Sequence, residues 1–173
     1  MALPRDYPEE NCSIARSLEV VGERWTLLIV RDAFYGVRRF TDFHTHLGIP
    51  KAVLSQRLAL LVEQGLLDTA VSVPGGRDEY VLTSMGRDLW PVMCALAQWG
   101  AEHYQTAQQR RSFVHAECGG PIDPQAVCAR CGDAPDPADV TTSPPRRARV
   151  SRDDATSKAL QRPHRMLEPI RPT

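Results

Sequence analysis

Residues 40–80 constrain this 173-residue chain more than any other segment, because two helical patterns and a hairpin pattern follow one another there. Phe40, Phe43 and Leu47 fall at i, i+3 and i+7 and predict a first helix, which Gly48 ends. Only a turn separates this helix from the next one. The order predicts a helix-turn-helix.

The second helix of this motif is predicted to begin at about Pro50, since proline is tolerated in a first helical turn. Its inward stripe is Leu54, Leu58 and Leu61. In a DNA major groove, Arg and Lys donate to guanine, Gln bonds adenine, and Ser contacts base or phosphate. The alternative is the solvated face that any amphipathic helix has. The polar residues in question are Lys51, Ser55, Gln56 and Arg57.

A β-hairpin is predicted after this helix. Residues 67–73 and 80–82 alternate in polarity, and Pro74-Gly75-Gly76 lies between them as a flexible tip. Arg77, beside the tip, is placed to enter a minor groove or to pair with phosphate. A solvent-exposed turn arginine, partly cancelled by the two acidic residues that follow, is the other interpretation.

The flanking segments are expected to supply the core. Residues 25–34 are apolar on all sides, which predicts a helix enclosed by others. After the hairpin, Thr83 is expected to cap a longer amphipathic helix, in which Pro91 predicts a kink or a restart near Trp90. The apolar stripe of this long helix needs a partner, and packing on its own domain is one alternative.

Composition limits the class of protein. With 42% hydrophobic and 24% charged residues, the chain can bury one ordinary core with a smaller appendage. Its 21 basic residues balance 21 acidic ones, so any nucleic-acid surface must be local. No apolar stretch approaches the roughly 20 residues of a membrane span, and residues 1–10 lack the pattern of a signal peptide, so we expect a cytoplasmic protein without membrane contacts. Without a nucleophile–base or acid–base constellation, we expect no enzyme.

Five cysteines, an odd number, favour metal binding or thiol chemistry over a disulfide framework. His115 and Cys118 form a His-x2-Cys pair, and Cys128 and Cys131 form a Cys-x2-Cys pair. Four soft ligands in two glycine-flanked turns predict a zinc ribbon or knuckle with structural zinc. A ribbon that has lost its metal and a redox dithiol are the alternatives.

From about residue 133 the chain turns to Pro, Asp, Ser, Thr and Arg. Such a segment buries too little surface to offset its ordering entropy, so residues 135–173 are predicted to be a disordered basic tail. Its charge either adds salt-dependent attraction to DNA or is simply solvated. The predicted organisation is a polar arm over residues 1–11, a main domain over 12–108, the zinc ribbon over 113–134 and the tail.

Several separate motifs resemble those of the HxlR-type winged-helix transcriptional regulators, in the family's order, from residue 12 to about residue 100. They are Cys12-Ser13-Ile14-Ala15-Arg16-Ser17-Leu18-Glu19 with Gly22, Trp25-Thr26-Leu27-Leu28-Ile29 with Arg31, Arg39-Phe40, Leu54-Ser55-Gln56-Arg57-Leu58, and Glu79-Tyr80-Val81-Leu82-Thr83. The resemblance implies a bacterial homodimer that binds double-stranded DNA. It also implies that the second helix is the recognition helix and that Gly75 to Arg77 form the tip of the wing.

In the resembled family, the long helix packs with the N-terminal helix across a twofold axis. Two recognition helices would then lie about one DNA turn, roughly 34 Å, apart on a palindromic operator. Some family members carry an oxidant-sensing cysteine near the N-terminal helix, which makes Cys12 a candidate redox sensor; a small packed cysteine is the alternative. The residues expected to contact DNA are Arg39, Lys51, Ala52, Ser55, Gln56, Arg57 and Arg77.

We therefore expect a mainly α fold with a β-hairpin wing (α+β), a winged helix-turn-helix followed by a small zinc-ribbon-like appendage. The expected function is sequence-specific transcriptional regulation, as a repressor whose DNA affinity responds to a small-molecule effector or an oxidant. The alternative is a thiol or metal redox protein that uses the Cys-x2-Cys pair and keeps the winged helix as a dimerising scaffold. Specific DNA binding separates these two expectations.

Overall fold

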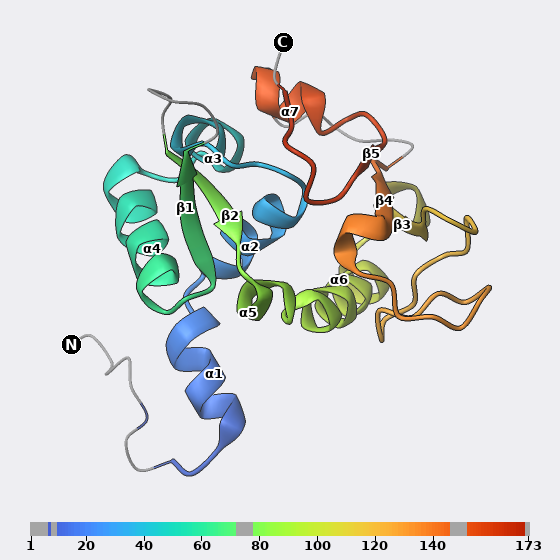
Figure 1. Ribbon diagram of the computed structural model, residues 1–173, viewed down its shortest axis with the longest axis horizontal. Coiled ribbons are helices and arrows are strands. Elements are labelled where there is room, and N and C mark those ends of the chain that lie inside the picture. The colour runs from blue at the N-terminus through green and yellow to red at the C-terminus, as the bar shows by residue number, and fades with distance from the viewer. Residues whose placement is uncertain (1–6, 8–9, 72–77, 146–151, 172–173) are drawn as a thin grey trace.

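The computed structural model describes residue 7 and residues 10–71, 78–145 and 152–171. A helical part that carries a β-hairpin lies beside a small three-stranded sheet (Figure 1). The helical part comprises α1 (Ser13–Val21), α2 (Thr26–Phe34), α3 (Phe40–Leu47), α4 (Lys51–Glu63), β1 (Leu67–Val71), β2 (Asp78–Leu82), α5 (Ser84–Arg87) and α6 (Trp90–Tyr104). The second part comprises η1 (Ala107–Gln109), β3 (Ser112–His115), η2 (Pro137–Asp139), β4 (Val140–Ser143), α7 (Ala155–Ala159) and β5 (His164–Arg165).

α3 and α4 form the helix-turn-helix that the sequence predicts. Gly48 ends α3 with a left-handed φ of +61°, a conformation that L side chains rarely adopt. Three residues later α4 begins at Lys51, next to its predicted start. Leu54, Leu58 and Leu61 are 0% exposed, which confirms the predicted inward stripe.

The predicted hairpin is confirmed. β1 and β2 pair antiparallel, with Leu67 opposite Leu82 and Thr69 opposite Tyr80. The N–H of Tyr80 donates to the carbonyl of Arg38 at 2.8 Å, so β2 is held against the loop that leads from α2 into α3. The tip of the hairpin, residues 72–77, lies outside the described residues.

α2 lies at the centre of the core, as its apolar sequence predicts. Ile29, Val30 and Phe34 on this helix are buried. The ring of Phe34 lies 5.4 Å from that of Trp90 at the start of α6, and the ring of Trp90 lies 5.3 Å from that of Phe113 in β3. This row of aromatic rings packs the small sheet against the helical part.

The long helix after the hairpin restarts where the sequence predicts. Thr83 caps α5, because its Oγ1 accepts a hydrogen bond from the N–H of Gly86 at 3.1 Å. α5 ends at Arg87 and α6 begins at Trp90. Pro91 falls in the first turn of α6, where its missing N–H leaves no helical hydrogen bond unmade.

The prediction of a disordered tail over residues 135–173 is wrong for residues 135–145 and 152–171. β4 pairs with β3 on one side and with β5 on the other, so the sheet takes strands from both sides of the boundary expected at residue 134. Leu160 and Met166 are buried. The N–H of Leu167 donates to the carbonyl of Phe34 at 2.8 Å, which ties the tail to the end of α2.

The tail is ordered because it does not need a core of its own. Its apolar residues are few and scattered, but they are buried on a surface that the helical part already provides, so each one stabilises the ordered state. The chain also passes close over Gly36, whose φ is +85°. A Cβ at Gly36 would meet the carbonyl oxygen of Glu168, so glycine leaves the room that this approach requires.

Replacing Met166 with alanine should therefore lower the free energy of unfolding by about 2–5 kcal/mol, because the change leaves a cavity where the tail meets the core. Urea unfolding followed by circular dichroism measures this difference. Met85→Ala is the matched control, since the Met85 side chain is exposed on α5 and its loss should cost less than about 0.5 kcal/mol. Equal stability of the two variants would contradict the ordered tail.

Candidate nucleic-acid interface and metal centre

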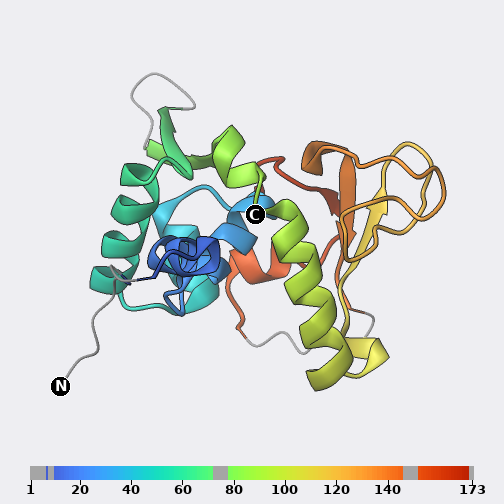
Figure 2. The same cartoon turned by 90° about the horizontal axis from the view of Figure 1, so that it is seen from below.

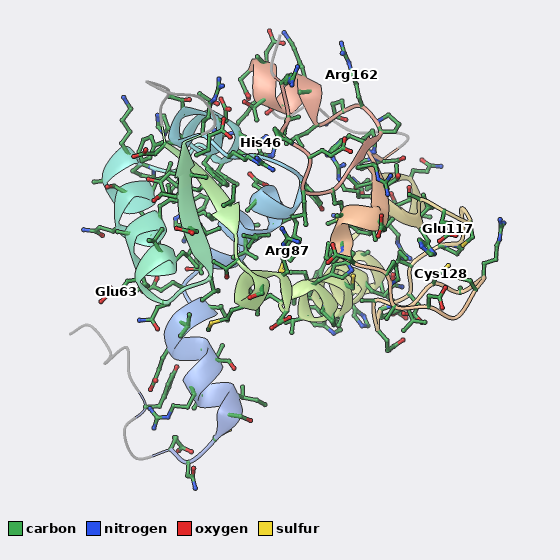
Figure 3. The ribbon with its side chains drawn as sticks, in the orientation of Figure 1. His46, Glu63, Arg87, Glu117, Cys128 and Arg162 are labelled. Carbon is green, nitrogen blue, oxygen red and sulfur yellow. The ribbon has the colours of Figure 1, made fainter. Side chains whose placement is uncertain are left out.

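One exposed face of α4 gathers four of the residues that the sequence predicts to contact DNA. Lys51, Ala52, Ser55 and Gln56 are exposed, and their spacing of i, i+1, i+4 and i+5 places them on one side of the helix. Figure 3 shows Glu63 at the end of α4 that is remote from α3. The exposed face therefore belongs to the half of α4 that follows the turn.

Arg57 does not share this face, contrary to its predicted place among the outward-pointing polar residues. Its side chain is 11% exposed, and its Nη2 lies 3.0 Å from Oε1 of Glu23 in the loop between α1 and α2. Arg57 lies three residues after Leu54 and four before Leu61, both buried, so its side chain leaves α4 near the inward stripe. The guanidinium therefore holds α4 against the N-terminal part of the domain.

Two arginines before α3 share one buried carboxylate. Nε of Arg39 lies 3.4 Å from Oε1 of Glu79, and Nη1 of Arg38 lies 3.8 Å from Oε2 of the same residue. The Arg39 side chain nevertheless remains 61% exposed beside the helix-turn-helix. Glu79 is thus a counter-ion that orients these arginines rather than an exposed acid of the wing. Arg77, the remaining predicted contact, lies outside the described residues.

The four predicted metal ligands meet in one cluster. Nδ1 of His115 lies 3.3 Å from Sγ of Cys131 and 3.5 Å from Sγ of Cys118. Sγ of Cys118 lies 3.4 Å from Sγ of Cys128 and 3.7 Å from Sγ of Cys131. One ligand atom from each residue lies within 4.8 Å of all the others, so the cluster could hold one metal ion. Figure 3 shows Cys128 in the loops on the side of the molecule remote from α4.

Backbone N–H groups donate hydrogen bonds to sulfur atoms of this cluster. His115 ends β3, and the N–H of Gly120 donates to Sγ of Cys118 at 3.4 Å. Hydrogen bonds from the N–H groups of Cys131 and then Arg130 lower the pKa of the Cys128 thiol from 9.0 to about 6. Cys128 therefore favours the thiolate, which is the form that binds metals. In the same cluster, a backbone hydrogen bond to Asp133 lowers the pKa of the Cys131 thiol. Burial and side-chain hydrogen bonds to Asp133, Cys128 and Cys118 outweigh it and raise this pKa to about 12.

The two remaining cysteines have different surroundings. Cys94 on α6 is buried, and burial raises the pKa of its thiol to about 12, so it packs as a small apolar residue. Cys12 is exposed at the start of α1. Hydrogen bonds from the N–H groups of Ala15 and Ile14 lower the pKa of the Cys12 thiol. A sensing role for Cys12 stays a prediction.

A charged cluster between α2, α3 and the tail was missed by sequence reasoning. Nε and Nη2 of Arg31 both donate to Oδ1 of Asp32, at 2.8 and 2.6 Å. Oδ2 of Asp32 lies 3.8 Å from Nε2 of His46 on α3, and Nδ1 of His46 lies 2.8 Å from Oγ of Ser157 on α7. The signal that could have found this cluster is the Arg-Asp pair inside an otherwise apolar helix.

A helix-turn-helix whose second helix exposes a polar face, followed by an antiparallel hairpin, defines the winged helix-turn-helix class of DNA-binding proteins. In the part of the chain that the structure describes, no helix has the length and apolar character needed to cross a membrane.

Comparison with known proteins gives the family. Residues 20–108 match the HxlR-like helix-turn-helix family. The chain is 45% identical over 137 residues to the uncharacterised HTH-type transcriptional regulator Rv3095 of Mycobacterium tuberculosis, a match that covers 78% of this chain and 87% of the relative. It is 29% identical over 110 residues to the uncharacterised HTH-type transcriptional regulator YybR of Bacillus subtilis, covering 61% and 87%. The chain therefore belongs to the HxlR-like family of helix-turn-helix transcriptional regulators.

Solved structures agree with this assignment. The crystal structure of PA1607, described as a candidate transcription factor, superposes with a TM-score of 0.62 at 37% identity and covers 72% of this chain and 89% of its own. The redox regulator HypR in its oxidised form superposes with a TM-score of 0.50 at 26% identity, over 55% of this chain and 100% of its own. The comparisons thus give a helix-turn-helix transcriptional regulator.

Proposed function

We propose that this protein is a homodimeric repressor that binds a palindromic operator. The observation that carries the proposal is the exposed face of α4 beside the turn from α3, where Lys51, Ser55 and Gln56 lie together. In the major groove, Gln56 would bond adenine in two places and Lys51 would donate to guanine or phosphate, while Ala52 would allow close approach of the helix. A repressor acts by occupying promoter DNA, and this action requires no catalytic residue.

The flanking arginines have separate roles in this proposal. Arg39 is exposed at the start of α3 and would contact a phosphate, with Glu79 fixing its direction. Arg57 would position α4 through Glu23 instead of reading a base. Arg77 remains the proposed contact of the wing with the minor groove.

Exposed apolar side chains on α1 and α6 support a dimer. Ile14 and Leu18 are exposed on α1, and Leu96 and Trp99 are exposed on α6. Figure 2 shows α1 end on and α6 along its length. A second copy would cover both helices across a twofold axis and set the two α4 helices about one DNA turn apart. Sedimentation equilibrium that finds a monomer at micromolar concentration would contradict this arrangement.

An oxidant response at Cys12 is a second candidate function. Its thiol is exposed, its pKa is lowered, and the similar protein HypR is a redox regulator. Oxidant should then change the DNA affinity of the native chain and leave that of Cys12→Ser unchanged. An equal response of both chains would exclude Cys12 as the sensor.

We also propose that the His/Cys cluster holds a structural zinc ion. Tetrahedral Zn²⁺ with bonds of about 2.3 Å to sulfur and 2.0–2.1 Å to nitrogen sets its ligand atoms roughly 3.5–3.8 Å apart. The closest distances in the cluster are 3.3–3.7 Å, so the side chains need to move little to bind the ion. Zinc would fix the loops between β3 and β4, where few apolar residues are available to do so.

Replacing Gln56 with alanine should weaken binding to the operator by about fivefold or more, because a bidentate contact to a base contributes roughly 1–3 kcal/mol of discrimination. A mobility-shift titration on the intergenic DNA upstream of the protein's own gene measures the loss. Gln64→Ala is the matched control, since Gln64 is exposed at the opposite end of α4 and should retain native affinity. The regulator function fails if the native chain binds neither this DNA nor a selected-site library at low salt.

Metal analysis of protein purified without chelator should find about one zinc per chain. Cys131→Ser should lose the metal, and its thermal unfolding temperature should fall, because zinc binding contributes directly to folding. Cys12→Ser is the matched control, since Cys12 lies outside the cluster and its loss should leave the zinc content unchanged. A native chain without zinc would exclude the proposed metal.

A further inference from the structure

A cavity of about 920 Å³ lies between α6, the end of α2, strand β3 and the loop that follows β3. Beside it lies a smaller apolar compartment of about 190 Å³, and the two share the lining residues Arg31, Tyr35, Ala97 and Phe113. Figure 2 shows α6 running alongside the small sheet. Pockets for small organic ligands occupy about 300–1,000 Å³ and combine apolar walls with a few polar groups, so this space suits such a ligand.

The larger cavity has an excess of positive charge. Arg31, Arg110 and Arg111 line it, and Asp123 is the one carboxylate among its described lining residues. Oδ1 of Asp123 already accepts hydrogen bonds from the backbone of the adjoining turn. Asp32, behind the wall, is paired with Arg31. Three arginines thus face two carboxylates. Each carboxylate accepts hydrogen bonds through Oδ1, and Oδ2 of Asp32 has no hydrogen-bond partner among the described residues.

Arg111 lacks an anionic partner in the described part of the chain. Its guanidinium donates to Oγ1 of Thr142 at 3.3 Å and to the carbonyl of Leu160 at 2.9 Å, and both acceptors are neutral. Its Cζ lies 4.7 Å from the ring centre of Tyr35, while that of Arg31 lies 5.9 Å from the same ring. Burial lowers the pKa of Arg111, and the charge of Arg31 acts in the same direction, while Tyr35 and Asp32 act against it. An anion between the two arginines would relieve this repulsion.

Two of the residues that line these compartments have buried N–H groups without a hydrogen-bond partner among the described residues. Nε of Arg110 in the large cavity and Nε1 of Trp90 in the apolar compartment are buried and have no partner among the described residues. Buried donors without partners destabilise the fold unless an acceptor reaches them. The apolar compartment, which includes Leu27, Phe34 and Met93, offers room for a ring or a short chain.

We propose that this double cavity binds an amphipathic organic anion, with the acid group among the arginines and the apolar body in the smaller compartment. Arg111 is the principal anion-binding residue, and Arg110 and Trp90 supply further donors. Arg31 contributes less to binding the anion, because its guanidinium already donates two hydrogen bonds to Asp32.

The site contacts the DNA-binding motif at His46 of α3, which lines the larger cavity. An acid group near Arg31 competes with Asp32 for the guanidinium, and Oδ2 of Asp32 lies 3.8 Å from Nε2 of His46 on α3. Because His46 also lines the larger cavity, a ligand would act on the helix-turn-helix both directly and through the Arg31–Asp32 pair. This effector role rests on the proposed DNA-binding function, whereas binding of the anion does not.

The test uses the full-length protein and two fluorescent probes of similar shape. 8-Anilinonaphthalene-1-sulfonate carries an acid group, and N-phenyl-1-naphthylamine lacks it. Arg111→Gln should bind the sulfonate at least about tenfold more weakly than the native chain, while its affinity for the neutral probe should stay within about twofold. Arg111→Lys should recover part of the sulfonate affinity, and Arg87→Gln, an exposed arginine on α5, should behave as the native chain.

Circular dichroism establishes that each variant is folded. If Arg111→Gln does not fold, Arg110→Gln decides the question, because Nε of Arg110 has no hydrogen bond to lose in the described residues. Equal sulfonate affinity of the native chain and the folded arginine variant, or no sulfonate binding by the native chain, overturns the proposal. If the native chain binds no DNA but still binds the sulfonate in a way that depends on Arg111, the anion site is supported. Its role as an effector site is then excluded.

Discussion

The packing of Phe34, Trp90 and Phe113 is the interaction on which the rest of the structure depends. The three rings belong to α2, α6 and β3, so one row of rings joins the central helix of the core, the long helix and the small sheet. Aromatic rings contribute large buried areas and have preferred geometries, which fixes both the distance and the angle between these elements. The tail reaches the same place, since the N–H of Leu167 bonds the carbonyl of Phe34.

The helix-turn-helix could be predicted because its determinants are local. Gly48 stops α3 by its own conformational freedom, and Leu54, Leu58 and Leu61 mark the buried side of α4 by spacing alone. The hairpin follows from alternation and a glycine-rich tip, and the metal-ligand pairs follow from their spacing. Local patterns of this kind specify an element whatever surrounds it.

What the sequence could not reveal depends on contacts between distant segments. The tail looked too polar to fold because its composition was judged alone, whereas Met166 is buried on a core built by residues far earlier in the chain. Arg57 looked like a reader of DNA because helical spacing does not reveal that Glu23 lies beside it. The same reason hid the pairing of Asp32 with His46 and the cavity behind it.

Two proposed sites share residues of β3. His115 at its end belongs to the proposed zinc site, and Phe113, two residues earlier, lines both compartments of the proposed ligand site. Thermodynamic linkage is reciprocal, so an ion that orders this strand would raise the affinity for the ligand by the same factor by which the ligand raises the affinity for the ion. With both sites filled, occupancy of the DNA would report the supply of metal and of organic acid together.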